Sequence, residues 1–409
     1  MSDSFTETTT ISWFTRIKNA FIGILIGLVL VVGSVAGIFW NEHRAVQTAR
    51  SLAQGRGLVV DVDAQSLDPA KAGKLVHVAG RSSVASPPRD GDFGVSAPAL
   101  RLKRISEMYQ WKEDKRTETH KNVGGSETQT TTYDYQKLWS EDAIDSSRFQ
   151  HAQEHRNPGK SVESRELYPQ GAKLGGFALD TDLLSQLPAD QRLAVSADLA
   201  AELKAKNTTN NANMHVSDGT IYIGPDPGSP RIGDMRISYR LMPVGELSVI
   251  AAQSGQGFAP YQTQAGDRLD MIAPGIKSAA DMFTAAEEEN TILTWALRAA
   301  FVIAIWVGCF LCLRPLAVFA DLIPFVGSMV GFGLGFVALL ATLVIAPIAI
   351  AIAWFAFRPL TAVAVLAGGA VLVVLAHRLR GRRAVAPATA SPQDDQSSIK
   401  GKGPGKRST

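Results

Sequence analysis

The chain has 409 residues, of which 46% are hydrophobic, and a formal net charge of +3 at pH 7. Its two cysteines cannot provide a disulfide framework, so any large domain needs its own apolar core. The hydrophobic residues are concentrated in one stretch near the start and three near the end, which excludes an ordinary water-soluble protein and predicts a membrane protein in contact with the lipid bilayer. No feature of the charge distribution indicates a nucleic-acid partner.

The first predicted transmembrane helix covers residues 20–40, and residues 1–19 are expected to form a cytoplasmic N-terminus. Arg16 and Lys18 precede the span, and short flanks rich in Lys and Arg stay on the cytoplasmic side. The apolar run is longer than that of a signal peptide, and acidic residues precede it. We therefore expect a retained anchor, while small residues within the span leave cleavage open as an alternative.

Residues 41–291 are predicted to form a large extracytoplasmic α+β domain in which antiparallel hairpins dominate. Apolar residues at helical spacing indicate that the first helix continues outward to about Gly55. Alternation of apolar and polar residues predicts a long hairpin whose two strands turn around residues 122–125. One or two short helices are expected within 181–206. Further strands are predicted at 58–62, 75–80, 220–223, 234–239, 245–252 and 257–264.

The C-terminal part is predicted to hold three more transmembrane helices, so the fold class is a membrane protein with one N-terminal and three C-terminal spans around the α+β domain. A helix starting near residue 278 should run unbroken into the second span. The long third stretch contains Pro347 and is predicted to be kinked there, with a span plus a re-entrant segment left open. The predicted segments are 292–313 for helix 2, 314–324 for a cytoplasmic connector, 325–357 for helix 3, 358–376 for helix 4 and 377–409 for a disordered tail.

Four crossings place both chain ends in the cytoplasm and the large domain outside it. This topology predicts a multi-pass protein of the bacterial inner membrane with a periplasmic domain, or of the endoplasmic reticulum and inner nuclear membrane if the source is eukaryotic. The tail is basic next to the last span. Either these arginines bind anionic lipid headgroups at the membrane surface or they only fix the topology, which we favour. The arginines concerned are Arg378, Arg380, Arg382 and Arg383.

One pattern in the external domain suggests metal chemistry. His151 and His155 lie in an H-x-x-E-H sequence, the inverted zincin motif, which makes a zinc-dependent hydrolase conceivable. However, an Asn-Pro-Gly sequence at 157–159 stops any helix directly afterwards, and no third ligand occurs at a plausible spacing. Cys309 and Cys312 form a C-x-x-C pair inside an apolar helix, where packing is the favoured role. We therefore predict no enzyme activity, no catalytic or metal-binding residues and no cofactor.

Glycines within the predicted spans recur four residues apart, which lets helix backbones approach closely. This spacing predicts helix packing, either within one chain or between protomers, and the sequence leaves both open. Ionisable residues flank the spans instead of occupying their centres, which argues against transport. The glycines predicted to mediate packing or oligomerisation are Gly23, Gly27, Gly33, Gly37, Gly327, Gly331 and Gly335.

Several collinear stretches, covering residues 12–380, together resemble the LUMA family, also called the transmembrane protein 43 family. The stretches that carry the resemblance are 41–45, 51–55, 107–111, 157–158, 232–239, 294–300 and 357–360. The tail extends beyond the usual end of the family, and the Ala- and Gly-rich spans suggest a bacterial member. The resemblance implies four spans, a luminal domain and oligomerisation, whereas emerin and lamins, the partners of animal members, are not expected for a bacterial chain.

The sequence therefore predicts a non-enzymatic membrane scaffold that self-associates and organises membrane or envelope complexes, with other membrane proteins as further partners. The rigid helical links to the external domain, the glycine faces and the absence of a recognisable catalytic motif all favour this reading. The alternative is a binding or chaperone-like module, in which the external sheet recognises a peptide, a lipid or an envelope component.

Overall fold

The computed structural model describes residues 3–196, 214–360 and, beyond them, 362–365, 367–369, 371 and 374–375. The chain divides into two compact units, residues 1–353 and 354–409. The predicted fourth span, 358–376, lies only partly within the described residues, and the basic tail with its four arginines lies outside them. The predicted helical region around 197–206 also lies outside them.

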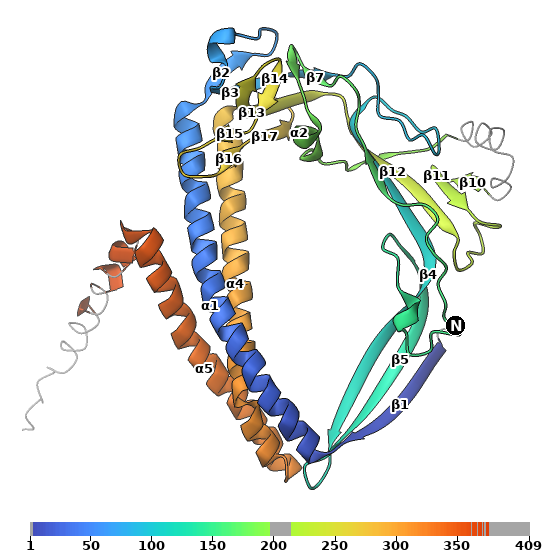
Figure 1. Ribbon diagram of the computed structural model, residues 1–409, viewed down its shortest axis with the longest axis vertical. Helices are drawn as coiled ribbons and strands as arrows, with labels where there is room; N and C mark the ends of the chain where they lie inside the picture. The colour runs from blue at the N-terminus through green and yellow to red at the C-terminus, as the bar shows by residue number, and fades with distance from the viewer. Residues whose placement is uncertain are drawn as a thin grey trace, which may run out of the picture. The chain divides into compact units, whose positions relative to one another are not determined.

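The first unit combines three long helices with many strands (Figure 1). The N-terminal half contains β1 (Asp3–Ile11), α1 (Trp13–Leu58), β2 (Val60–Asp63), the 3-10 turn η1 (Pro69–Lys71), β3 (Leu75–Ser83), β4 (Ala99–Lys121), β5 (Glu127–Ser140), the 3-10 turn η2 (Ser146–Arg148), β6 (Arg165–Leu167), β7 (Lys173–Leu174), β8 (Phe177–Ala178) and α2 (Thr181–Ser185). The rest contains β9 (Gln191–Leu193), β10 (Met214–Ser217), β11 (Thr220–Ile223), β12 (Met235–Pro243), β13 (Glu246–Ser254), β14 (Gly257–Ala259), β15 (Tyr261–Gln262), β16 (Arg268–Leu269), β17 (Met271–Pro274), α4 (Ala279–Ala320) and α5 (Pro324–Phe357).

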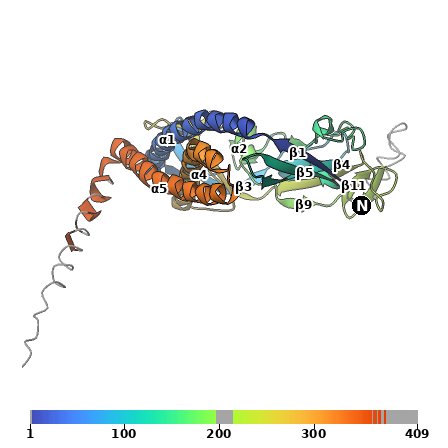
Figure 2. The ribbon, with the colours of Figure 1, turned by 90° about the horizontal axis from the view of Figure 1, so that it is seen from below.

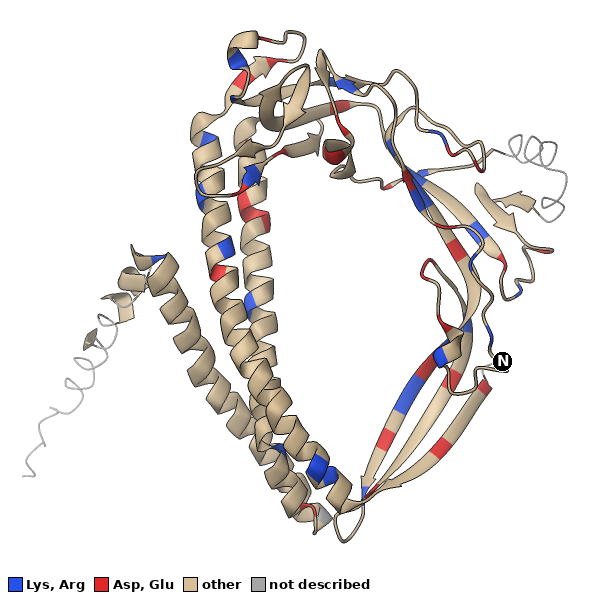
Figure 3. Cartoon of the chain, in the orientation of Figure 1, with Lys and Arg blue, Asp and Glu red and all other residues tan. Residues whose placement is uncertain are grey.

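Three described helices, α1, α4 and α5, are long and apolar enough to cross a membrane. The two helices that leave the membrane, α1 and α4, continue without a break into the β-rich domain, as predicted. Ser278 caps α4, because its hydroxyl accepts a hydrogen bond from the backbone of Asp281 at 3.1 Å. Helix α5 is continuous through Pro347. Lys, Arg, Asp and Glu are sparse along the middle of α1 and α4 and frequent towards their ends (Figure 3).

The strands form two main sheets. The first has the order β1-β5-β4-β12-β11-β10, with β6 on β4 and β9 on β12. The second has the order β17-β13-β14-β8-β7-β3-β2, with β13 also paired to β3. Most pairs are antiparallel, as predicted, and the exceptions are β2 with β3 and β14 with β8. Each sheet buries a separate apolar cluster, centred on Phe177 and Val249 for the second and on Ile237 and Tyr239 for the first.

The predicted long hairpin is β4 with β5. Fourteen residue pairs join the two strands, from Met108 opposite Ser140 to Lys121 opposite Glu127. The face of β4 predicted from the alternation is buried, since its six members are each at most 3% exposed. These residues are Leu100, Leu102, Arg104, Ser106, Met108 and Gln110. Alternation therefore predicted the hairpin and grouped these six residues on one face, and the structure shows that this face is the buried one.

The N-terminus differs from the prediction. Residues 1–19 were expected to be a cytoplasmic tail on the opposite side of the membrane from residues 41–291. In the structure, residues 3–11 form β1, which pairs with β5 along nine residues, from Asp3 opposite Tyr135 to Ile11 opposite Glu127. The Thr-rich run at 3–11 favours a strand because β-branched residues have high β-propensity, and the charge rule for flanking residues does not take this propensity into account. The two segments assigned to opposite faces are thus hydrogen-bonded in one sheet.

Candidate functional site

The stretches that carry the family resemblance contact one another in space. Residues 41–45 of α1 lie against 290–298 of α4, and residues 107–111 of β4 lie against 157–158 and 232–236. Sequence reasoning gave these stretches no chemical role. In the structure they form two joints, one between the helices and one within the first sheet.

The helix joint is a buried polar cluster between α1 and α4. The Glu42 carboxylate pairs with the Arg298 guanidinium at 2.5 Å, and the two side chains are 0% and 7% exposed. Asn41 donates to the backbone carbonyl of Thr294 at 3.0 Å, and Asn290 donates to that of Ala45 at 3.0 Å. Because an unpaired charge in this apolar setting would be costly, the cluster specifies which residues of the two helices face each other.

The helix joint continues into the apolar core of the domain. Arg44 donates to Asn290 and to the Thr294 hydroxyl, both at 3.0 Å, on the outward side of the ion pair. Farther along the helices, Leu52 and Phe283 pack together in one buried cluster with residues of the second sheet. The direction of the domain relative to the helix pair is therefore fixed by packing as well as by hydrogen bonds.

The predicted packing glycines fall into two groups. At Gly27, an added Cβ would lie 2.6 Å from the carbonyl oxygen of Gly308 on α4, and at Gly37 it would meet the ring of Phe301. Gly23 is in ordinary contact with Leu311, and an added Cβ at Gly327 would collide with Asp321. These four glycines serve contacts within the chain. At the remaining three, Gly33, Gly331 and Gly335, an added Cβ would meet nothing within 4 Å among the described residues, although the Gly335 carbonyl accepts from the Trp306 indole of α4 at 3.2 Å.

In the sheet joint, the Asn157 side chain makes the hydrogen bonds that a neighbouring strand would make. Where β12 stops pairing with β4, the Asn157 amide takes over: its oxygen accepts from the Trp111 backbone N–H at 2.7 Å, and its nitrogen donates to the Trp111 carbonyl at 2.9 Å. Next to it, Gly233 has φ +97°, and an added Cβ would lie 2.8 Å from Pro158. Only glycine combines this backbone conformation with the close approach.

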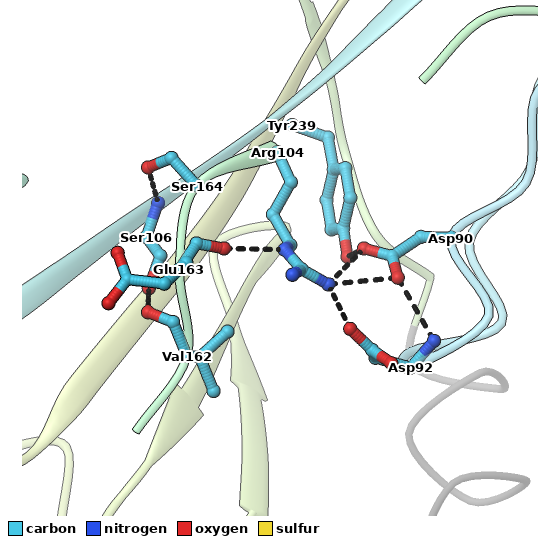
Figure 4. A network of polar contacts seen from close by, with 8 residues as sticks. All are labelled: Asp90, Asp92, Arg104, Ser106, Val162, Glu163, Ser164 and Tyr239. Atoms are coloured by element: carbon cyan, nitrogen blue, oxygen red, sulfur yellow. Dashed lines mark hydrogen bonds and ion pairs between the residues drawn. The ribbon is translucent and has the colours of Figure 1, made fainter. Parts of the chain in front are cut away.

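A buried ion pair fastens the loop before β4 to the same sheet (Figure 4). Arg104 contacts both carboxylate oxygens of Asp90 at 2.8 and 2.9 Å and that of Asp92 at 2.7 Å. Tyr239 donates to Asp90 at 2.7 Å. Burial and the neighbouring Asp90 carboxylate raise the pKa of Tyr239 above its usual range, so the phenol keeps its proton. Every charged group here has its partner, which is typical of a structural network and not of a catalytic one.

At the opposite end of the helix pair, three segments meet in a second charged cluster, which we call the clasp. It consists of Trp13, Arg16, Lys121, Gly125, Glu127 and Asp321. Asp321, at the end of α4, pairs with Arg16 and, at 2.6 Å, with Lys121. Arg16 also pairs with Glu127 at 2.7 Å. The turn of the hairpin is thus held against the first turn of α1 and the last of α4.

Backbone contacts complete the clasp. Arg16 also donates to the carbonyl of Gly125, and Gly124 donates to the carbonyl of Leu322 at 3.2 Å. The Trp13 indole donates to the carbonyl of Val318 at 3.1 Å. Sequence reasoning noted Asp321 only as a charge flanking a span and missed the clasp, because its parts are far apart in the chain. The high β-propensity of the Thr-rich run at residues 3–11 was the available signal.

The two histidines of the H-x-x-E-H pattern do not face a common metal position. They lie in a turn, and the His155 Nδ1 is 3.1 Å from the carbonyl oxygen of His151. The His155 ring stacks on Tyr135 at 3.7 Å, and the His151 ring stacks on Phe5 of β1 at 4.0 Å. Among the described residues, no three His, Cys, Asp or Glu side chains converge as metal ligands. In this structure the histidines pack β1 against the sheet.

The cysteine pair also lies in a packing position. Cys309 is buried in α4, and the Cys312 thiol lies 3.7 Å from the carbonyl oxygen of Ile24 on α1. An added Cβ at Gly27 would come within 2.8 Å of that same sulfur. Both cysteines are free thiols. Their surroundings are those of a close contact between helices.

The comparisons with known proteins agree with these motifs. A family model described as transmembrane protein 43 matches residues 108–359. The chain is 30% identical to transmembrane protein 43 of Homo sapiens over 377 residues, which cover 89% of this chain and 92% of the relative. It is 26% identical to the transmembrane protein 43 homolog of Drosophila melanogaster over 290 residues, which cover 69% of this chain and 74% of the relative. No solved structure matches at a significant level.

Proposed function

The chain belongs to the transmembrane protein 43 family, and from this premise we propose that it is a non-enzymatic membrane scaffold that self-associates and organises membrane or envelope complexes. The observation that carries the proposal is that the same polar domain contacts the α1–α4 pair at two separate places, through the apolar cluster of Leu52 and Phe283 next to the helix joint and through the clasp. Bacterial inner membrane with a periplasmic domain is the proposed location, with the endoplasmic reticulum as the eukaryotic equivalent.

The distance between the two contacts supports this proposal. Arg16 and Asn41 are separated by 25 residues of helix, or about 38 Å at 1.5 Å per residue. The hydrocarbon of a bilayer is about 30 Å thick. The helix joint and the clasp therefore flank an apolar stretch of roughly membrane thickness, which places them near opposite interfaces if α1 crosses the bilayer.

The polar ribbon is formed by β1, β5 and the distal half of β4, which lie side by side (Figures 1 and 2), and it starts at the clasp and continues along β4 into the rest of the first sheet. Its strands carry many Thr, Glu, Asp and Lys residues. Polar strands with open edges are not stable against lipid, and at membrane depth such a backbone persists only where protein or water covers it. Neighbouring copies of the chain would supply that cover. Self-association therefore follows from the ribbon as well as from the glycines.

The open glycines indicate where copies could meet. Gly331 and Gly335 lie one helical turn apart on α5, and an added Cβ at either, or at Gly33 on α1, would meet nothing within 4 Å among the described residues, although the Gly335 carbonyl accepts a hydrogen bond from Trp306 of α4 at 3.2 Å. Large apolar side chains nearby are exposed, including Phe332 at 85% and Phe336 at 57%. Small residues beside exposed aromatics provide the close backbone approach that membrane helices use for association.

Mass measurement in lipid nanodiscs tests the proposal. We expect the wild-type chain to form a defined oligomer, and a Gly331→Leu/Gly335→Leu variant to shift towards the monomer. The melting temperature of the same variant is the control, because the Gly335 carbonyl accepts from Trp306 of α4 and a loss of packing within the chain would lower it. A monodisperse wild-type monomer in several detergents and in nanodiscs would rule out self-association.

A second candidate is a binding or chaperone-like module. A pocket of about 400 Å³ lies between β17 and α4, lined by methionine, isoleucine and alanine side chains with Lys277 and Glu289 at its rim. Such a site suits an apolar chain with one polar end. Lipid extraction of the purified protein followed by mass spectrometry, with Ala286→Trp to fill the pocket, tests this function. Equal lipid content in both proteins would count against it.

A further inference from the structure

The outer face of the first sheet contains a row of cations in direct register. Arg192 of β9 lies opposite Arg240 of β12, and Arg240 lies opposite Lys103 of β4. Directly opposed residues of neighbouring strands have their Cβ atoms only about 4.5–5.5 Å apart, and like charges at that separation destabilise the sheet. Three positive side chains side by side therefore require an explanation.

Neighbouring acids neutralise the row only in part. Glu166 of β6, opposite Lys103, pairs with Arg101 at 2.6 Å and accepts from Tyr168 at 2.8 Å. The pKa of the Glu166 carboxyl is lowered, first by its hydrogen bond with Arg101 and to a smaller extent by the charge of Lys103, so this carboxylate serves Arg101 before the row. Glu107, farther along β4, is held by both nitrogens of Arg236 at 2.9 Å.

The cations of the row keep donors available. Arg240 makes one long hydrogen bond, 3.4 Å to the carbonyl of Asp190, and Arg192 donates through one nitrogen to Asp218 and Thr220. A guanidinium carries five N–H donors, so each arginine retains several for a further acceptor. Lys103 is half-buried and forms no ion pair within 4 Å among the described residues.

The face is also hollow at this point. A pocket of about 250 Å³ is lined by Arg192, Arg236, Arg240, Glu107, Thr220, Ser238 and Tyr239. It combines three guanidinium groups with the hydroxyls of Thr220 and Ser238 and contains a single carboxylate. Guanidinium groups match the geometry of phosphate oxygens, and hydroxyls add neutral donors. We propose that this pocket binds a phosphate group, carried either by a small soluble ester or by a lipid headgroup.

The pocket goes beyond the scaffold function and does not depend on it, because it lies on the sheet and shares no residue with the helix contacts. An anion in the pocket would relieve the repulsion along the row. Removing one cation from the empty pocket should relieve the same repulsion. This distinguishes a binding site from a purely structural cluster, whose loss would only destabilise the fold.

The test uses the full chain in nanodiscs of neutral phosphatidylcholine, titrated with pyrophosphate at constant ionic strength. We expect pyrophosphate to raise the melting temperature, and Arg240→Gln to weaken its binding about tenfold or more, in line with the loss of a charge-assisted hydrogen bond. Without ligand, Arg240→Gln should melt at or above the wild-type temperature. Arg116→Gln, which removes an exposed cation from the hairpin, is the matched control and should bind as wild type does.

In a second experiment, the same proteins are mixed with vesicles of phosphatidic acid or of phosphatidylcholine. Retention by phosphatidic acid that Arg240→Gln abolishes identifies a headgroup, whereas binding of pyrophosphate alone identifies a soluble ester. The proposal is overturned if neither phosphate source binds, if Arg240→Gln binds as tightly as the Arg116→Gln control, or if Arg240→Gln lowers the melting temperature of the ligand-free protein.

Discussion

The two ends of the α1–α4 pair are fastened by different physical means. The helix joint combines the Glu42–Arg298 ion pair with an apolar cluster, and nearly all of its groups come from the two helices themselves. The clasp relies on charges and backbone hydrogen bonds from three segments, with little apolar burial. The helix joint therefore determines which faces of α1 and α4 meet, whereas the clasp only holds the hairpin in place. The clasp should therefore open first.

The largest effect is expected at the joint. Glu42→Ala removes the carboxylate that faces the buried Arg298, and breaking a buried pair from one side costs about 3–5 kcal/mol. We expect a large fall in the melting temperature of the purified protein, followed by tryptophan fluorescence. A Glu42→Ala/Arg298→Met double variant should recover part of the loss, since no charge then stays without its partner. An unchanged melting temperature for Glu42→Ala would show that the pair does not hold the helices.

The next effect distinguishes glycines that pack within the chain from those that face outward. Gly27→Val places a side chain against the Gly308 backbone, and such overpacking costs about 1–3 kcal/mol. Gly33→Val, in open space on the same helix, should leave thermal stability unchanged. Equal losses in both variants would mean that Gly33 is also covered within the chain.

The clasp should respond locally. Asp321→Asn weakens the contacts to Arg16 and Lys121, but Glu127 still pairs with Arg16, so we expect a cost of about 1–2 kcal/mol. Hydrogen exchange should accelerate in residues 120–128 while α1 and α4 keep their protection. Uniformly faster exchange along both helices would contradict the idea that the clasp is the weaker end.

The smallest effect concerns the ribbon at high pH. Burial and a hydrogen bond to Glu113 raise the pKa of Tyr135 from 10.0 to about 12. Because the folded state favours the neutral phenol, this contribution to stability is fully present below pH 10 and is lost as pH rises from 10 to 12. The melting temperature of the purified protein should therefore fall over this range. Tyr135→Phe should remove that part of the pH dependence, and a retained dependence would assign it to other groups.

Local patterns predicted the parts of the fold that depend on local periodicity. The β4–β5 hairpin and the grouping of residues from Leu100 to Gln110 on one face followed from alternation, and the continuous helices followed from apolar spacing beyond the spans. The Ser278 cap likewise lies next to the predicted start of α4. In each case the signal and the element occupy the same residues, so no distant partner had to be known.

The remaining features depend on distant partners. β1 pairs with a strand more than a hundred residues away, and the turn around Gly125 meets Asp321 from the other end of the chain. Glycine spacing could not distinguish Gly27, which packs against α4, from Gly331, where an added Cβ would meet nothing within 4 Å among the described residues. Both glycines have the same local sequence pattern. The Asn157 side chain bonds to the backbone of Trp111 in place of a strand, and this role could be recognised only once the position of Trp111 was known. Such contacts arise from topology and not from local propensity.

A pair of engineered cysteines can test whether β1 pairs with β5 within one chain. The Thr6 and Thr132 hydroxyl oxygens lie 3.4 Å apart on neighbouring strands. In native membranes, on a Cys309→Ser/Cys312→Ser background, Thr6→Cys/Thr132→Cys should form an intrachain disulfide, whereas the out-of-register Thr10→Cys/Thr132→Cys pair should not. If Thr6→Cys/Thr132→Cys does not crosslink, and the two cysteines are labelled from opposite faces of the membrane, β1 and β5 do not pair within one chain.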